Sequence, residues 1–220
     1  MFKRESEAEG RLRIKICGIT NAVDALAAID CGADALGFNF VPRSKRYLDI
    51  NSAADWMATL PSSAAKVVIL ADPSFEEAIR MAELPFIDAL QLHGNESPAL
   101  CRRLAECGIQ FAKAIPVSNQ ASLQNAVSFH TSTIVLDSTS EGQFGGSGRA
   151  FPWELARQFV RAQPALKIVL AGGLTPENVA CAVAEARPFG VDVTSGVESS
   201  PGRKDHSRMQ AFIDAARRAG

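Results

Sequence analysis

Short apolar runs rich in β-branched residues recur along the chain and alternate with longer segments in which apolar residues follow helical spacing. Eight runs have the length and composition of strands: 13–17, 33–40, 65–71, 86–93, 110–117, 132–138, 166–173 and 190–196. The helical segments between them include 21–32, 74–83, 97–108, 175–186 and 205–220. Both faces of the strand runs are apolar, which indicates a parallel sheet covered by helices.

Strict alternation of strand and helix predicts a single-domain α/β protein, a (β/α)₈ TIM barrel of the phosphate-binding type, over residues 13–220. An open, doubly wound sheet is the alternative. The barrel is favoured because the unit count is eight and because no G-x-G-x-x-G turn follows the first strand run.

Helix starts carry local signals. Ser74 with Glu77 three residues later fits a capping box, and Thr175 before Pro176 fits a cap followed by proline at the first helical position. Thr20 is expected to cap the first helix.

The charges are nearly balanced, with 23 basic and 24 acidic residues. Such a chain has no global field to attract nucleic acid or an anionic membrane, so we expect neither as a partner. Any anionic ligand must be bound by local groups.

The first twelve residues are charged and lack an apolar segment of the length that a signal peptide or membrane span requires. We expect residues 1–12 to form a flexible leader and the protein to be cytoplasmic. The five cysteines are odd in number and form no CxxC pair, which argues against a disulfide framework and a structural zinc site. No pattern indicates a metal or a cofactor.

The first strand run ends in a cysteine, at the barrel edge where active sites of this fold lie. Because side chains alternate along a strand, Ile14 and Ile16 are expected to face the helices, and Lys15 and Cys17 the interior. A nearby cation favours a thiolate, so Lys15 is expected to lower the pKa of Cys17. An inert, buried cysteine is the alternative.

The same alternation turns other polar side chains into the barrel mouth. Asp137 faces inward at the end of its strand, although an aspartate there often caps a turn or pairs with a lysine. Gln91 and His93 lie on the face opposite two leucines; a lone histidine is more often structural, so His93 is not assigned as a base. Asn39 points inward if its flanking phenylalanines pack on helices.

Two glycine-rich turns, "AGGLTPENV" and "TSGVESSPG", follow the seventh and eighth strand runs. In this fold such turns commonly bind phosphate through free backbone N–H groups and the helix dipole. The basic loop "PRSKRY" follows the second run, and an arginine there is either solvated or grips a carboxylate. Together these groups suit proton transfer on a phosphorylated small molecule that carries a second anionic group.

Several motifs in order resemble the phosphoribosylanthranilate isomerase family, barrel enzymes of tryptophan biosynthesis. They are "KICGIT", "GADALGFNF-VPRSKRY", "LQLHGNE", "LDS" followed by "FGGSGRAFPW", "LAGGLTPENV" and "VDVTSGVESSPGRKD". The resemblance runs from about Ile14 to the last helix. It departs at Asn39, where the family more often has a hydrophobic residue, and at "VVILADPS", where the commoner form ends in Phe-Val-Asn or Phe-Val-Asp.

The resemblance implies an isomerase without a cofactor. The reaction is the Amadori rearrangement of N-(5-phosphoribosyl)anthranilate to 1-(2-carboxyphenylamino)-1-deoxyribulose 5-phosphate. Asp137 would be the general acid that opens the furanose ring, and Cys17 the general base that removes the proton from sugar C2. Arg46 would bind the anthranilate carboxylate.

The resemblance also implies supporting roles around these three residues. Backbone amides would hold the phosphate at Gly172, Gly173, Ser195 and Gly196. Gln91 and His93 would orient the sugar or shape the mouth. Lys15 would support the thiolate, and Asp192, inward by alternation, would position a loop or the ribose.

Two other functions also fit the glycine turns. A histidine-pathway isomerase generally uses two aspartates, one at the end of the first strand, and Cys17 at that position argues against it. A non-catalytic barrel that binds a sugar phosphate has no need of both Cys17 and Asp137. The sequence leaves open whether the protein is a monomer or a homodimer, and whether the loop from Gly145 to Gly148 closes over the substrate.

Overall fold

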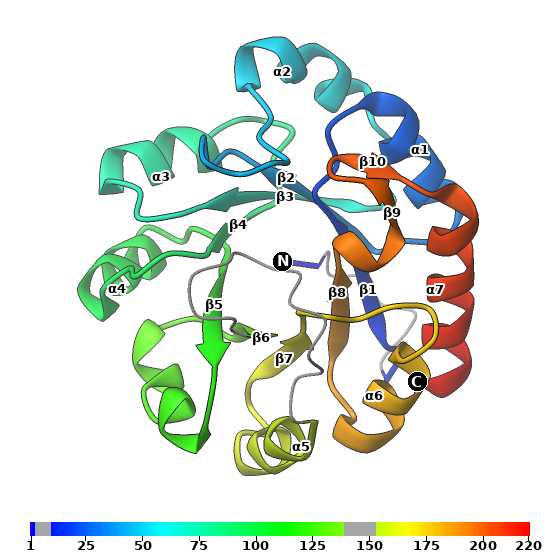
Figure 1. Cartoon of the computed structure of the whole chain (residues 1–220). Coiled ribbons are helices and arrows are strands. Elements are labelled where there is room, and N and C mark those ends of the chain that lie inside the picture. Colours follow the sequence, from blue (N-terminus) through cyan, green and yellow to red (C-terminus); the bar gives the residue numbers. More distant parts are fainter. Residues whose placement is uncertain (3–9, 139–152) are drawn as a thin grey trace.

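The computed structural model describes residues 1–2, 10–138 and 153–220, and eight of its strands form a closed parallel barrel in chain order (Figure 1). The strands are β1 (Arg13–Cys17), β2 (Ala35–Asn39), β3 (Ala65–Leu70), β4 (Ala89–Leu92), β5 (Phe111–Val117), β6 (Thr133–Ser138), β7 (Lys167–Leu170) and β8 (Gly190–Val193). The predicted (β/α)₈ barrel is confirmed, and the open sheet is wrong because β8 pairs with β1.

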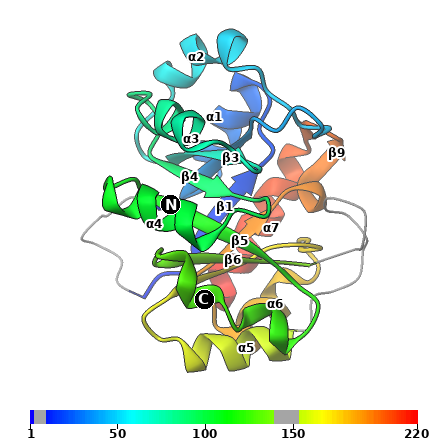
Figure 2. The ribbon, with the colours of Figure 1, turned by 90° about the vertical axis from the view of Figure 1, so that its left-hand side faces the viewer.

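Helices surround the barrel on its outside; α2 and α5 lie on opposite flanks in the side view (Figure 2). The helices are α1 (Ala22–Asp30), α2 (Ile50–Thr59), α3 (Phe75–Ala82), α4 (Pro98–Glu106), α5 (Trp153–Ala162), α6 (Val179–Ala186) and α7 (His206–Ala219). Two short 3₁₀ helices, η1 (Gln120–Leu123) and η2 (Ala126–Phe129), stand between β5 and β6 in place of an α-helix.

A short insertion follows β8 that the hydrophobic pattern did not predict. It comprises the 3₁₀ helix η3 (Ser195–Val197) and an antiparallel hairpin of β9 (Glu198–Ser200) and β10 (Arg203–Lys204). The strands of this hairpin are three and two residues long, too short to show a period of two in the sequence.

The strand side chains divide between two layers, as their alternation predicted. Ile14, Ile16, Ile134 and Leu136 belong to the large core between the strands and the helices. The barrel interior is lined instead by small residues, namely Ala35, Ala65, Val67, Ala112, Ala114, Val135, Val169 and Ala171. These small side chains leave room in the interior for the fully buried Lys15.

The first residues contact the barrel where the structure describes them. Met1 is buried with the interior residues of the barrel, and Phe2 packs edge-on against Phe189 at 5.7 Å between ring centroids. Leu12, at the other end of the expected leader, is also buried. Residues 3–9 lie outside the described residues, so a flexible leader over residues 1–12, ahead of a barrel domain at 13–220, stays a proposal.

The helix-start predictions have different outcomes. The capping box of Ser74 and Glu77 is present at α3. Helix α6, however, begins at Val179 rather than at Pro176, because Asn178 holds the preceding segment as a turn. Its Oδ1 accepts a hydrogen bond from the Thr175 amide at 2.8 Å, and its Nδ2 donates to the Gly173 carbonyl at 2.9 Å.

The prediction for the first helix is also wrong. Asn21 is the N-cap of α1 and accepts a hydrogen bond from the amide of Asp24 at 2.9 Å. The hydroxyl of Thr20 donates instead to the carbonyl of Gly202 at 2.5 Å. Thr20 therefore ties the end of β1 to the β9–β10 hairpin.

A buried ion pair holds the turn that follows β4. The Lys113 ammonium lies 2.9 Å from the Glu96 carboxylate, with 4% and 0% of the two side chains exposed. Lys113 also donates to the carbonyls of Gly94 at 2.9 Å and Ala114 at 2.7 Å, and Glu96 accepts from the amide of Asp72 at 3.0 Å. The charges are thus fully partnered, and they fix the turn directly after His93.

Replacing Lys113 with methionine is expected to destabilise the fold by roughly 3–5 kcal/mol, because it leaves the buried Glu96 carboxylate without its cation. Urea unfolding measures the change. Arg102→Met is the control: that side chain is 60% exposed and lies 3.9 Å from Glu106, so its loss is expected to cost about 0.5 kcal/mol or less. Equal costs for the two variants would contradict the assignment.

Candidate active site

The candidate groups gather at the carboxyl ends of the strands. Cys17 is the last residue of β1, and Asp137 is the next-to-last residue of β6. In the closed barrel β7 and β8 stand between these two strands, so the two glycine-rich turns lie between the thiol and the carboxyl group. This places an expected phosphate site between the expected base and acid.

Cys17 lies above a buried ion pair that joins the first and last barrel strands. The Lys15 ammonium is 2.6 Å from the Asp192 carboxylate, and the two residues are direct partners in the pairing of β1 with β8. Lys15 also hydrogen-bonds the Cys17 side chain. Burial alone would lower the pKa of Lys15, but attraction to Asp192 and then to Cys17 outweighs it and raises that pKa.

The expectation of a lowered pKa for Cys17 is wrong. Burial of the thiol raises its pKa above the ordinary value, and the attraction of Lys15 only partly offsets this effect. The negative charge of Asp192 also raises the pKa of Cys17. Lys15 is itself paired with Asp192, and its attraction for the thiolate does not outweigh the effect of burial.

Gly37 makes the room that the thiol occupies. A Cβ atom at this position would lie 2.7 Å from the Cys17 Sγ and 3.0 Å from the Lys15 Cε. Both distances are shorter than ordinary van der Waals contact. The absence of a side chain at this position of β2 therefore allows the sulfur to lie where it does.

Asp137 belongs to a chain of polar contacts that reaches down β4. Its Oδ2 lies 3.1 Å from the His93 Nε2, and the His93 Nδ1 lies 3.0 Å from the Gln91 Nε2. On the other side, a Cβ atom on Gly172 would lie 2.5 Å from the Asp137 Oδ1. The carboxyl group is thus held between His93, directly after β4, and the backbone of Gly172, two residues after β7.

The two glycine turns present backbone donors. Gly172 and Gly173 have positive φ angles of 76° and 69°, which glycine adopts without strain. Within the described part of the chain, the amide N–H groups of Gly173, Ser195 and Gly196 donate to no backbone or side-chain oxygen. Free amides from two neighbouring turns can together bind an anion.

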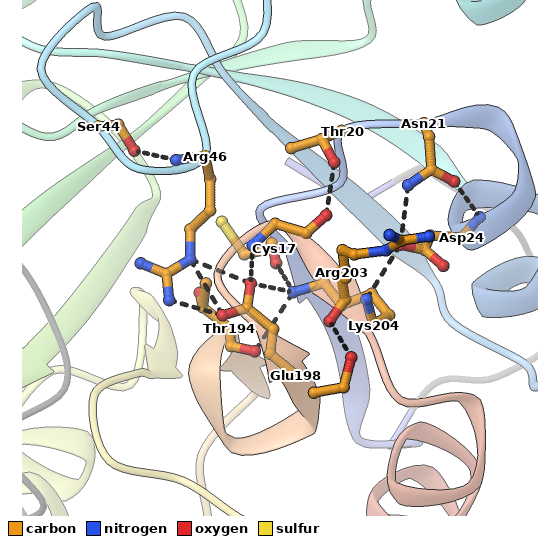
Figure 3. Close-up of polar contacts among 12 residues, drawn as sticks. Cys17, Thr20, Asn21, Asp24, Ser44, Arg46, Thr194, Glu198, Arg203 and Lys204 are labelled. Atoms are coloured by element: carbon orange, nitrogen blue, oxygen red, sulfur yellow. Dashed lines mark hydrogen bonds and ion pairs between the residues drawn. The ribbon is translucent and has the colours of Figure 1, made fainter.

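Arg46 lies beside Cys17 and is paired with Glu198 of β9 (Figure 3). Its Nη2 is 2.6 Å from the Glu198 Oε2, and its Nε is 3.0 Å from Oε1. Lys204 of β10 adds a second cation, with its ammonium 3.1 Å from the same Oε1. The hydrogen bonds that Arg46 donates to Glu198 raise the pKa of Arg46.

The Lys204 ammonium connects this cluster to the ends of β1 and β8. It donates to the carbonyl of Cys17 at 2.6 Å and to the carbonyl of Thr194 at 3.2 Å. Burial lowers the pKa of Lys204, and the attraction of Glu198 offsets only part of this lowering. Burial would by itself raise the pKa of Glu198, but Arg46 and Lys204 together lower it.

Two features are absent from residues 1–2, 10–138 and 153–220. No group of three or more His, Cys, Asp or Glu side chains there is arranged to hold a metal ion. No helix there has both the length and the apolar character needed to cross a membrane.

Comparison with known proteins identifies the family. The sequence model of one protein family, described as N-(5'-phosphoribosyl)anthranilate (PRA) isomerase, matches residues 14–215 of this chain. The N-(5'-phosphoribosyl)anthranilate isomerase of Thermotoga maritima is 42% identical over 206 residues, which cover 94% of this chain and 98% of that protein. The enzyme of the same name from Magnetococcus marinus is 41% identical over 208 residues, covering 94% of this chain and 96% of that one.

The chain belongs to the phosphoribosylanthranilate isomerase family.

Solved structures agree with this membership. The phosphoribosylanthranilate isomerase of T. maritima superposes with a TM-score of 0.86 at 41% identity, covering 93% of this chain and 98% of that one. A phosphoribosylanthranilate isomerase in complex with reduced 1-(o-carboxyphenylamino)-1-deoxyribulose 5-phosphate has a TM-score of 0.81 at 39% identity, with the same coverage.

The residues expected from the family motifs lie at one mouth of the barrel, and two residues there make contacts that the sequence did not predict. Arg46 pairs with the carboxylate of Glu198, and Asn39 caps a turn, since its Oδ1 accepts from the Val41 amide at 2.9 Å. The loop from Gly145 to Gly148 lies outside the described residues.

Sequence reasoning missed Glu198 and Lys204. Both stand in the quoted motif "VDVTSGVESSPGRKD", on either side of the turn at Gly202. The sequence does contain an indication of this pair, because an acidic and a basic residue on either side of a tight turn can form an ion pair across it. Strand alternation could not reveal them, since they come after the last barrel strand.

Gly37→Ala is expected to lower isomerase turnover about 100-fold, because the new methyl group displaces the sulfur of Cys17 and misplacement of a reacting group by about 1 Å costs this much. Steady-state kinetics measures the change. Ala28→Gly, a one-carbon change at a buried position of α1, serves as a control that destabilises without reaching the mouth. Full turnover in Gly37→Ala would contradict the placement of the thiol.

The alkylation of Cys17 is expected to rise about tenfold per pH unit between pH 7 and pH 9. Iodoacetamide reacts with the thiolate, and a thiol with a raised pKa gains thiolate over that whole interval. Peptide mass spectrometry of alkylated protein follows each cysteine separately, with the exposed Cys107 as the internal reference. A plateau for Cys17 below pH 8 would show that its pKa is lowered instead.

Proposed function

We propose that this member of the family converts N-(5'-phosphoribosyl)anthranilate into its 1-deoxyribulose 5-phosphate isomer at the mouth formed by β1, β6, β7 and β8. The observation that carries the proposal is the placement of one thiol and one carboxyl group at the same mouth, with free amides between them. An Amadori rearrangement needs an acid, a base and an anchor for the phosphate, and needs no redox group.

Asp137 is the proposed general acid. It delivers a proton to the furanose ring oxygen, the bond between that oxygen and C1 breaks, and the anthranilate nitrogen supplies the electron pair that forms the Schiff base. His93, 3.1 Å away, can donate Nε2–H to the resulting carboxylate and hold it in place. The proton that Asp137 has lost is replaced from solvent.

Cys17 is the proposed general base. Its thiolate removes the proton from sugar C2, the electrons of that bond form a double bond between C1 and C2, and the Schiff-base nitrogen becomes neutral. The resulting enolamine tautomerises to the ketone. Because burial raises the pKa of Cys17, the thiolate is a minor form at neutral pH. The positive charge of Lys15 favours the thiolate and so makes this rise in pKa smaller.

Two anchors are proposed for the ends of the substrate. The amides at Gly172, Gly173, Ser195 and Gly196 bind the phosphate. Arg46 binds the anthranilate carboxylate: with Lys204 it carries two positive charges against the single negative charge of Glu198, so the cluster is left with one net positive charge.

Gln91 and Asp192 are proposed to act from the barrel interior. The Gln91 Oε1 and the Asp192 Oδ1 are buried and, within the described residues, have no hydrogen-bond partner. Buried oxygens of this kind are expected to accept a donor, which a sugar hydroxyl or a bound water can supply. Gln91 also positions His93.

We propose further that the protein acts in the cytoplasm, as a monomer or a homodimer. One solved relative from T. maritima is described as a dimeric phosphoribosylanthranilate isomerase from which monomers were generated. The proposal for this chain is tested by its molar mass in solution.

Cys17→Ala and Asp137→Asn are each expected to lower turnover by roughly 10²–10⁴-fold, the usual contribution of one proton-transfer residue. Loss of anthranilate-type fluorescence follows the reaction, and circular dichroism checks the fold. Cys181→Ala, at an exposed cysteine of α6, is the matched control. Wild-type turnover in Cys17→Ala would remove it as the base, and binding without turnover in the wild type would favour a sugar-phosphate-binding module.

A further inference from the structure

Glu198 occupies a central place in the mouth that the reaction scheme does not use. Its side chain is 3% exposed, and its two oxygens contact both cations of the cluster, Arg46 and Lys204. It also accepts a hydrogen bond from the amide of Gly202 at 3.3 Å. A carboxylate so enclosed by donors has one orientation available to it.

The Arg46–Glu198 contact leaves one edge of the guanidinium open. Arginine has five N–H donors, and Glu198 takes the Nε–H and one N–H of Nη2. In the part of the chain that is described, the remaining three donors have no acceptor. A paired guanidinium with a free outer edge can still bind a second carboxylate bidentately.

The same carboxylate links this free edge to the position of Cys17. Lys204 bridges the Glu198 Oε1 at 3.1 Å and the Cys17 carbonyl at 2.6 Å (Figure 3). The stem of Arg46 packs over the neighbouring Gly18, where a Cβ atom would lie 3.1 Å from the Arg46 Cδ. Both ends of the linkage are therefore held to the end of β1.

We propose that Glu198 is a positioning residue that sets the specificity for arylamine substrates with a carboxylate. It acts through Arg46, whose outer edge it holds at a fixed separation from Cys17. The inference rests on the proposed function, because it assumes that Arg46 meets the substrate carboxylate. It adds that the recognition of the carboxylate depends on a protein carboxylate that never touches the substrate.

The test compares two substrates in the wild type and in Glu198→Gln. One is made by condensing ribose 5-phosphate with anthranilate, and the other with aniline, which lacks the carboxylate. For the anthranilate substrate we expect KM to rise about 10-fold, the order expected when one charged hydrogen bond is weakened, while kcat changes less than about 3-fold. For the aniline substrate the two enzymes are expected to agree within about 2-fold.

A merely structural role for Glu198 predicts a different result. It would lower the turnover of both substrates equally, and this outcome would overturn the proposal. Tighter binding of the anthranilate substrate in Glu198→Gln would also overturn it. That result would mean that the net positive charge of the Arg46–Lys204–Glu198 cluster, and not the orientation of Arg46, determines how the substrate carboxylate is bound. A wild type that turns over neither substrate would refute the proposed function instead.

Three further variants make the comparison secure. Glu106→Gln breaks an exposed pair with Arg102 on α4 and is the matched control, with no change expected for either substrate. If Glu198→Gln does not fold, Glu198→Asp keeps the charge but withdraws it by one methylene, and the same selective rise in KM is expected. In an Arg46→Lys background, Glu198→Gln is expected to add less than about 2-fold, since both changes act through one contact.

Discussion

The ion pair between Lys15 and Asp192 closes the barrel, and the chemistry at the mouth depends on it. The two residues are direct partners across the seam between the first and last strands, and their charged atoms are 2.6 Å apart in the buried interior. Neither charge could be buried there alone. The pair therefore brings β8, with its glycine turn, against β1, with its thiol, and it sets the electrostatic surroundings of that thiol.

Much of this arrangement follows from the alternation of side chains along strands. Ile14 and Ile16 pack toward the helices, and Lys15 lies inside, because a strand offers only these two directions. Asp137 and Gln91 could be placed on the inner face in the same way. Closure of a parallel barrel then gathers the ends of all strands at one edge, so a list of strand ends is already a list of candidate site residues.

The features that the sequence did not reveal depend on contacts between distant segments. The pKa of Cys17 rises first because the thiol is buried and second because Asp192, 175 residues later in the chain, adds a nearby negative charge. The pairing of Arg46 with Glu198 likewise joins two loops that no local pattern relates. Helix α6 begins at Val179 because the Asn178 side chain hydrogen-bonds the backbone of Thr175 and Gly173. These bonds hold residues 175–178 as a turn, although Pro176 is typical of a first helical position.

The hydrogen bond from Lys204 to the carbonyl of Cys17 has a consequence for how the molecule comes to be active. The residues that flank the thiol come from the first strand and from the segment after the last one, so no fragment containing only one half of the chain can hold the complete mouth. Contacts of such long sequence separation require a long loop to close, which costs chain entropy. Catalytic competence therefore requires that both ends of the chain have been brought together in the closed barrel.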